Sequence, residues 1–226
     1  MRITLPSGTP AELARPESGA PVQGLVLIPD IGGLRPLFDE HCARLAHEYD
    51  LVVCAPEPFP GDEDKPIDWR MDHAGDRGDD LRLADIVAAA DATGCERVGV
   101  IGFCMGGMLT LKAAGTGRFD RAGAFYGMVR VPDNWKNDAT VEPLDAVTAP
   151  GACPVIAIIG LNDTWTPPDD VAALEATGAT IVRYEGAEHG FAHDASRPTH
   201  RAADAADAFR RVMAFINGET VETVEA

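Results

Sequence analysis

Short apolar runs alternate with amphipathic stretches along most of the chain. The runs are nearly continuous rather than alternating between polar and apolar residues, which is typical of strands buried on both faces of a parallel sheet. These predicted strands span 22–29, 51–55, 98–101, 121–126, 154–160 and 180–184. Ahead of them, residues 2–5 and 11–14 flank a turn at Pro6-Ser7-Gly8 and predict a short β-hairpin.

The stretches between the apolar runs have the spacing of helices. In 36–49 the apolar side chains of Leu37, Cys42 and Leu45 fall on one side. Three further stretches, at 79–93, 168–176 and 201–217, are predicted helices, the second of them opened by proline. We expect 56–78, which is rich in Pro, Gly and Asp, to be a long surface loop of the kind that often carries function.

The alternation of strands and helices predicts an α/β fold. Because each helix must carry the chain back to start a parallel strand, we expect a mostly parallel central sheet with helices on both faces. The length of 226 residues suits a single domain over residues 1–226 with a sizeable core.

The net charge of the chain excludes some classes of binding partner. The formal net charge of −17 argues against nucleic acid and against anionic membrane surfaces. No segment approaches the ~20 apolar residues of a membrane span, and the N-terminus lacks an apolar signal core. We therefore expect a cytoplasmic protein without a membrane partner, and the sequence leaves a monomer and a homodimer both open.

Five cysteines occur in the sequence, at positions 42, 54, 95, 104 and 153. They fit reduced thiols better than a disulfide framework, and no C-x-x-C pair indicates a zinc site. We interpret Cys42, Cys54, Cys95 and Cys153 as small hydrophobic residues in or beside packed elements.

Cys104 stands in a different setting, because residues 98–107 read Val-Gly-Val-Ile-Gly-Phe-Cys-Met-Gly-Gly. An apolar strand leads through a sharp turn into a helix, which is the G-x-nucleophile-x-G elbow with cysteine where serine is more usual. Glycine is expected at Gly102 and Gly106 because the strained turn brings neighbouring backbone too close for a Cβ atom. The alternative is a buried, inert cysteine beside a glycine turn.

A cysteine nucleophile needs a base, and the base needs an orienting group. On folds with such an elbow the chain order is nucleophile, acid, histidine. Asp163, just beyond strand 154–160, and His189, beyond strand 180–184, supply that order. The alternatives are a turn or helix-capping role for Asp163, and a surface role or a metal pair with His193 for His189.

Together these motifs resemble the dienelactone hydrolase family. The likeness rests on the elbow, the Asp163 loop, and the segments Tyr184-Glu-Gly-Ala-Glu-His-Gly-Phe191, Leu27-Ile-Pro-Asp-Ile-Gly-Gly33 and Ala124-Phe-Tyr-Gly127, in consistent order over most of the chain. It implies an α/β-hydrolase fold and a carboxymethylenebutenolidase-like hydrolysis of small esters or lactones. The implied machinery is a Cys104–His189–Asp163 triad that forms an acyl-enzyme, without metal or cofactor. The resemblance also implies an oxyanion hole made by the backbone N–H groups of Ile31 and Met105.

Departures from the family pattern bear on the substrate. The family's hydrolases carry a glutamate that helps manage the cysteine's proton where Asp30 stands, so Asp30 is expected to act there, with a strand-end turn role as the alternative. The arginine that binds the substrate carboxylate is replaced by His193, which is only partly charged and lacks the bidentate fork. A second family arginine comes from the loop before the elbow, where Arg70 and Arg77 are candidates. We therefore expect neutral or weakly charged esters and lactones to be preferred over dienelactone.

Four aromatic residues are candidates for the pocket wall, with core or lid packing as the alternative: Trp69, Tyr126, Trp135 and Trp165. At the level of function, an acyltransferase and a non-catalytic binding or redox-sensing protein on the same scaffold remain alternatives to a hydrolase. A reactive Cys104 without turnover of any activated ester would favour the non-catalytic protein, whereas transfer to an added alcohol or thiol would reveal the acyltransferase.

Overall fold

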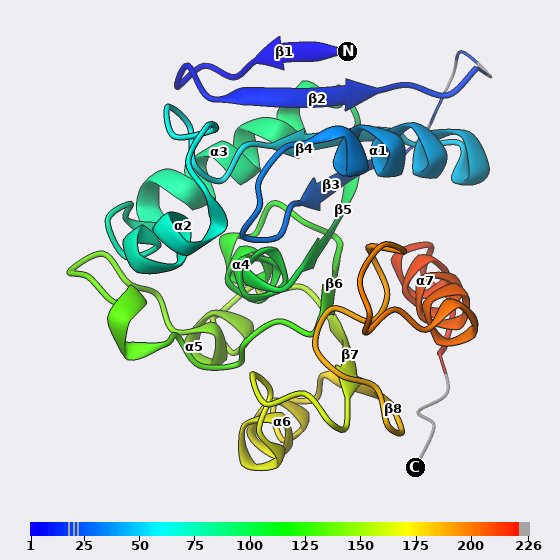
Figure 1. Ribbon diagram of the computed structural model, residues 1–226. Coiled ribbons are helices and arrows are strands. Elements are labelled where there is room, and N and C mark those ends of the chain that lie inside the picture. Colours follow the sequence, from blue (N-terminus) through cyan, green and yellow to red (C-terminus); the bar gives the residue numbers. More distant parts are fainter. Residues whose placement is uncertain (18, 20, 22, 222–226) are drawn as a thin grey trace.

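An eight-stranded sheet forms the centre of the protein in the computed structural model, which describes residues 1–17, 19, 21 and 23–221 (Figure 1). The strands lie side by side in the order β1-β2-β4-β3-β5-β6-β7-β8. Their bounds are β1 Arg2–Thr4, β2 Pro10–Ala14, β3 Gln23–Ile28, β4 Val52–Pro56, β5 Arg97–Phe103, β6 Arg121–Phe125, β7 Val155–Gly160 and β8 Thr180–Tyr184.

The sheet is parallel from β4 to β8, and the β1–β2 hairpin joins it antiparallel through β2. Both the hairpin and the parallel sheet confirm the expectation from the sequence. The strand order reverses around β3, which has β4 on one side and β5 on the other. In open α/β sheets, ligands bind beyond the carboxyl ends of the strands at such a reversal. Here that point lies just after residues 28 and 103, where Asp30 and Cys104 are found.

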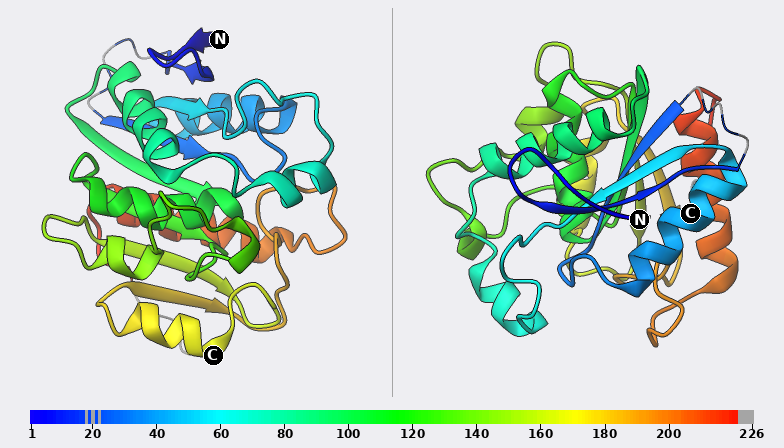
Figure 2. Two further views of the ribbon diagram at one scale, coloured as in Figure 1. Left: turned by 90° about the vertical axis from the view of Figure 1, so that its left-hand side faces the viewer. Right: turned by 90° about the horizontal axis from the view of Figure 1, so that it is seen from above.

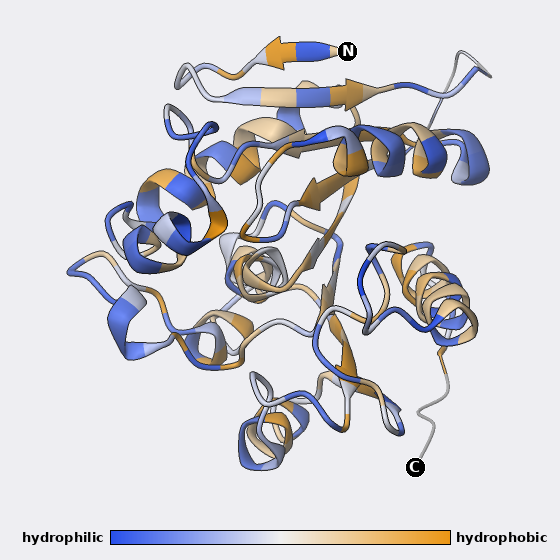
Figure 3. Cartoon of the chain, in the orientation of Figure 1, coloured by the Kyte–Doolittle hydropathy of each residue, from blue (hydrophilic) through white to orange (hydrophobic). Residues whose placement is uncertain are grey.

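Helices cover both faces of the sheet, as expected (Figure 2). One face packs against α1 (Pro36–Tyr49) and α7 (Ala202–Ile216). The other packs against α3 (Asp79–Ala92), α4 (Met105–Ala113) and α6 (Pro168–Glu175), and α5 (Pro143–Val147) packs on α4. Every residue of β3, β4 and β7 is buried, which explains why these strands are continuous apolar runs in the sequence (Figure 3).

The segment 56–78 is not the plain surface loop expected from its composition. It contains the helix α2 (Ile67–His73), and Glu57, Phe59 and Arg70 within it are buried. The one buried residue of α2 is the charged Arg70, so no apolar stripe marked this helix in the sequence.

Short elements account for the remaining differences from the expected structure. Helix α5 and two 3-10 helices, Ala114–Thr116 and Asp133–Trp135, are too short to show a periodic pattern. Val22, the first residue of one predicted strand, lies outside the described residues. In the part of the chain that the structure describes, no helix combines the length and apolar character needed to cross a membrane.

Candidate active site

Cys104 occupies the sharp turn between β5 and α4, and its backbone is in the left-handed region, with φ 57° and ψ −119°. L-residues rarely adopt this conformation, so the turn is strained in the way expected of a nucleophile elbow. A Cβ atom at Gly102 would overlap the backbone of Gly106, and one at Gly106 would overlap the backbone at the end of β3. The two glycines therefore let α4 pack directly beneath the turn, as predicted.

Asp163 and His189 meet at the same edge of the sheet. Asp163 follows β7 and His189 follows β8, and His189 Nδ1 lies 2.8 Å from Asp163 Oδ2. The Asp163 side chain is fully buried, whereas that of His189 remains 16% exposed. The other carboxylate oxygen, Oδ1, accepts the backbone N–H of Trp165 at 2.8 Å. Asp163 thus stabilises its own turn and also orients the imidazole. The predicted turn role and the predicted role as partner of His189 are therefore compatible.

The imidazole of His189 also faces the Cys104 side chain. Its Nε2 is buried and makes no hydrogen bond of ordinary geometry within the described residues. Burial alone would lower the pKa of His189, but the bond to Asp163 and the adjacent Cys104 side chain outweigh it and raise the pKa to about 9. At neutral pH the ring therefore holds a proton beside the sulfur.

The two backbone N–H groups predicted to bind an oxyanion belong to residues beside Cys104. Met105 begins α4, so its N–H has no acceptor within the helix, and it lies at the positive end of the helix dipole. Ile31 follows β3 in a turn closed by the Gly33 N–H, which donates to Asp30 O at 2.9 Å. Ile31 and Cys104 line the same pocket. Met105 thus follows Cys104 in the chain and Ile31 shares its pocket, and their role as oxyanion donors stays a prediction.

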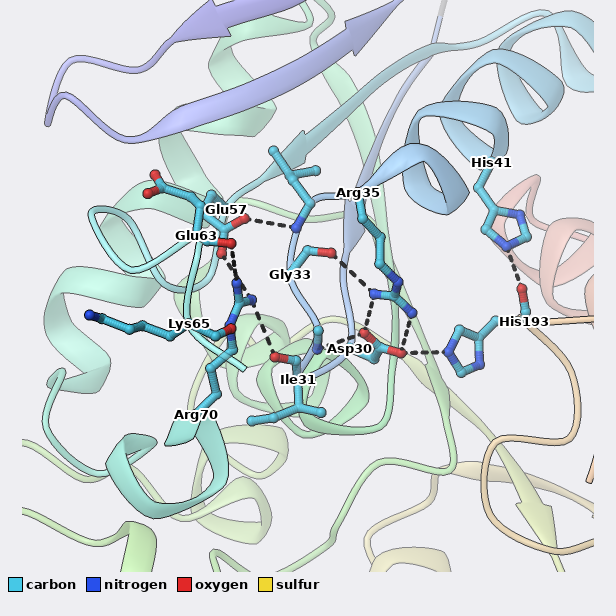
Figure 4. Close-up of polar contacts among 12 residues, drawn as sticks. Asp30, Ile31, Gly33, Arg35, His41, Glu57, Glu63, Lys65, Arg70 and His193 are labelled. Atoms are coloured by element: carbon cyan, nitrogen blue, oxygen red, sulfur yellow. Dashed lines mark hydrogen bonds and ion pairs between the residues drawn. The ribbon is translucent and has the colours of Figure 1, made fainter. Parts of the chain in front are cut away.

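Asp30 lines the pocket, but its carboxylate is already engaged (Figure 4). It accepts from Arg35 Nη1 at 2.6 Å, Arg35 Nη2 at 2.9 Å, His193 Nε2 at 2.8 Å and Gly32 N at 2.9 Å. Burial opposes ionisation, yet the bonds from His193 and Arg35 hold the pKa of Asp30 well below its ordinary value. Proton exchange between Asp30 and Cys104 remains a prediction, and it would require Asp30 to release one of these partners.

His193 does not contact the pocket, which corrects the expectation that it binds substrate. Its side chain is fully buried. Because Asp30 is ionised, Nε2 of His193 carries the proton, and Nδ1 accepts the hydroxyl of Tyr126 at 2.5 Å. His41 Nε2 donates to the carbonyl oxygen of His193 at 2.7 Å. His193 is therefore the centre of a buried network behind Asp30, and Tyr126, also fully buried, belongs to that network rather than to the pocket wall.

The two candidate arginines also lie away from the pocket. Arg70 is buried against Glu57, with 3.8 Å between Nη1 and Oε1, and donates to backbone carbonyls. Arg77 pairs with Asp85 at 2.5 Å. Their place in the chain suggested that one of them binds a substrate carboxylate. Each instead pairs with a carboxylate of the protein, Glu57 or Asp85, and nothing in the sequence indicated this pairing.

The pocket above Cys104 encloses about 550 Å³ of empty space, part of it open to solvent. Its remaining lining residues are Ile67, Met71, Met128, Trp135, Trp165 and Arg197. Of the predicted aromatics, Trp135 and Trp165 are present, while Trp69 stacks on His73 outside it, with 3.9 Å between ring centroids.

Sequence reasoning missed the apolar lining residues Ile67, Met71 and Met128, and it missed a charged one, Arg197. Among the described residues its guanidinium has no hydrogen bond or ion pair, although the chain is strongly acidic. It lies across Gly190, where a Cβ atom would come within 2.9 Å of Arg197 Cζ. No motif marks this position. The only signal was its place in the loop after the candidate catalytic histidine.

Comparisons with known proteins agree with this arrangement. The sequence profile of the dienelactone hydrolase family matches residues 9–220. A putative carboxymethylenebutenolidase from Synechocystis sp. is 28% identical, covering 92% of this chain and 90% of its own, and a carboxymethylenebutenolidase from Rhodococcus opacus is 27% identical, covering 84% and 79%. The crystal structure of a putative dienelactone hydrolase from Klebsiella pneumoniae superposes with a TM-score of 0.83 at 26% identity, covering 96% of this chain and 97% of the other. The resemblance read from the sequence is confirmed: the chain belongs to the dienelactone hydrolase family and is a hydrolase with the α/β-hydrolase fold.

Proposed function

We propose that the protein hydrolyses small esters or lactones with Cys104 as nucleophile, His189 as general acid and base, and Asp163 as the residue that orients the imidazole. One observation carries the proposal: His189 is hydrogen bonded to buried Asp163 and turns its other nitrogen toward the sulfur in the strained elbow. Nucleophile, base and orienting group in this arrangement are the requirement for covalent catalysis.

The proposed reaction has two halves. The Cys104 sulfur, its proton held on His189, attacks the carbonyl carbon, and the carbonyl oxygen becomes an oxyanion that accepts from the N–H groups of Ile31 and Met105. As the intermediate collapses, the carbon–oxygen ester bond breaks and His189 gives its proton to the leaving oxygen. A water molecule, deprotonated by His189, then attacks the thioester, releasing the acid and regenerating Cys104. In a lactone, the acyl and leaving groups stay joined in one product.

The pocket supports a revised expectation for the substrate. Apolar side chains such as Met128 and Trp165 make most of the wall, and Arg197 adds a positive charge that no carboxylate of the described residues pairs with. The preference for neutral substrates was inferred from the loss of arginine at position 193, but an arginine reaches the pocket from position 197 instead. We therefore include in the proposal that the pocket accepts an ester or lactone that carries a carboxylate.

The decisive experiment is Cys104→Ala assayed with activated esters and with a lactone. The proposal expects the variant to fold normally and lose turnover. Full activity in the variant would refute the mechanism. Product analysis with an added alcohol or thiol distinguishes hydrolysis from acyl transfer, which no feature of the pocket favours.

A further inference from the structure

Glu57 and Arg70 form a buried ion pair that the proposed chemistry does not use. The side chain of Glu57 is fully buried and that of Arg70 is 4% exposed, and neither lines the pocket. Buried ion pairs lose so much hydration that they are weak evidence for a stabilising role. The hydrogen bonds of Glu57 and Arg70 indicate instead that the pair fixes the conformation of the neighbouring turn.

Both side chains hold the turn that follows β3 (Figure 4). Glu57 Oε2 accepts the N–H of Leu34 at 2.7 Å, while its Oε1 accepts the N–H of Phe59 at 2.8 Å. Arg70 Nη1 donates to the carbonyl oxygen of Ile31 at 3.4 Å. At Gly33, whose φ is +65°, a Cβ atom would overlap both charged groups. The turn therefore passes directly against the ion pair.

The contacts fix both peptide groups that flank Ile31. The carbonyl of Asp30 accepts from Gly33 N at 2.9 Å, inside the turn. In a trans peptide the C=O and N–H point in opposite directions, so this bond directs the Ile31 N–H outward. The next peptide is held at its oxygen by Arg70 and at its nitrogen by the Asp30 side chain, 2.9 Å from Gly32 N. Rotation of either peptide would break at least one of these bonds.

Arg70 also ties the turn to the pocket wall. It lies on α2, which contributes Ile67 and Met71 to the pocket, and it donates to the carbonyl oxygens of Glu63 at 2.8 Å and Lys65 at 3.1 Å in the segment leading into the helix. One side chain thus connects this segment, α2 and the turn.

We propose that Glu57 and Arg70 are positioning residues that hold the 30–34 turn so that the Ile31 N–H points at the oxyanion. The inference rests on the proposed Cys104 mechanism. An oxyanion donor stabilises negative charge that develops only when a carbonyl is attacked. We therefore expect Glu57 and Arg70 to affect ester and lactone hydrolysis but not other reactions of the Cys104 sulfur.

The test compares two reactions of the same sulfur in Arg70→Met and Glu57→Gln. Hydrolysis of an activated ester requires the oxyanion donors, whereas alkylation of Cys104 by iodoacetamide displaces iodide and forms no oxyanion. We expect kcat for Arg70→Met to fall about 10- to 100-fold, short of the ~10²–10³-fold loss for complete removal of one donor. Glu57→Gln, which keeps the side chain's shape and one acceptor, should lose less. In both variants the alkylation rate at Cys104, followed by mass spectrometry, should stay within about twofold of the native rate.

The matched control is Lys112→Met, which breaks another buried pair, Lys112–Asp79 at 2.7 Å, at the end of α4 opposite Cys104. It should lower Tm as Arg70→Met does but leave kcat near the native value. Unchanged kcat in Arg70→Met and Glu57→Gln, or parallel loss of hydrolysis and alkylation, would overturn the inference. If Arg70→Met does not fold, the isosteric Glu57→Gln decides. Full ester turnover by Cys104→Ala would instead refute the proposed function itself.

Discussion

His189 Nδ1 lies 2.8 Å from Asp163 Oδ2, and the other oxygen of the same carboxylate accepts the Trp165 N–H at 2.8 Å. The turn after β7 and the orientation of the imidazole are therefore set by one buried side chain. A substitution that preserves one of these bonds and removes the other can separate the two roles.

Asp163→Asn is such a substitution. The amide oxygen can still accept from Trp165, but the NH₂ group would face His189 and favour the wrong tautomer of the ring. We expect kcat/KM for ester hydrolysis to fall by up to ~10⁴-fold, as in the corresponding change in a serine protease, with little change in Tm. Activity within tenfold of the native level would contradict the proposed role of Asp163.

Iodoacetamide should label Cys104 ahead of the other cysteines. Cys104 is half-buried at the pocket, whereas burial raises the pKa of Cys54 to about 12 and that of Cys153 to about 11. Thiols that do not ionise react slowly. Cys95 is half-buried like Cys104 but does not line the pocket, so inactivation should follow the modification of Cys104 and not that of Cys95. Peptide mapping after partial inactivation measures this, and faster labelling of another cysteine would count against it. The Cys104→Ala variant measures how much iodoacetamide the other cysteines take up.

The residues of the proposed triad could be found from the sequence because local rules mark them. Cys104 lies in a short glycine motif that can be read from the sequence, although only Gly102 is required by a neighbour within a few residues and Gly106 is required by the distant end of β3. Asp163 and His189 each follow a buried strand. The order of the parallel strands then brings the three to one edge of the sheet. The same rules gave the fold, because each central strand is a continuous apolar run.

The surroundings of the triad could not be found in this way. Arg70 and His193 are polar residues in the interior, and their positions depend on partners distant in sequence, Glu57 and Asp30. Arg197 reaches the pocket from a loop with no periodic pattern. Nothing in the local sequence distinguishes a charge that pairs inside the protein from one that faces a ligand.

The raised pKa of His189 predicts a pH-dependent contribution to stability. The folded-state pKa of about 9 exceeds the ordinary 6.5, so the protonated ring stabilises the native state fully below pH 6.5, and this contribution is lost as the pH rises through about 9. An NMR titration of the ring should give the raised value. The difference in unfolding free energy between native protein and His189→Gln should shrink over that range by on the order of 1–3 kcal/mol. If the His189 ring titrated near pH 6.5, the predicted pH-dependent contribution to stability would be excluded.

Arg197→Gln should separate anionic from neutral substrates. For a lactone with a carboxylate, loss of one charge-assisted hydrogen bond worth ~1.5–3 kcal/mol should lower kcat/KM about 10- to 100-fold, mainly through KM. A matched neutral lactone should be little affected. Arg77→Gln is the control for charge, because Arg77 pairs with Asp85 outside the pocket. Equal losses on both lactones would refute the carboxylate subsite.

The buried position of His193 predicts that its variants change stability rather than substrate affinity. The imidazole donates to Asp30 and accepts from Tyr126, and its ring stacks on Phe103, with 5.0 Å between ring centroids. In His193→Gln the amide offers one donor and one acceptor to the same partners. His193→Leu leaves the buried Tyr126 hydroxyl without its acceptor and leaves Asp30 Oδ2 with Arg35 as its remaining donor. We expect His193→Leu to reduce the unfolding free energy by about 2–4 kcal/mol and His193→Gln by clearly less, because an unpaired buried polar group costs ~1–3 kcal/mol. Denaturant unfolding measures the difference. KM for an anionic lactone should change little in His193→Gln. A large rise in KM without loss of stability would show that His193 contacts the substrate, as the sequence suggested.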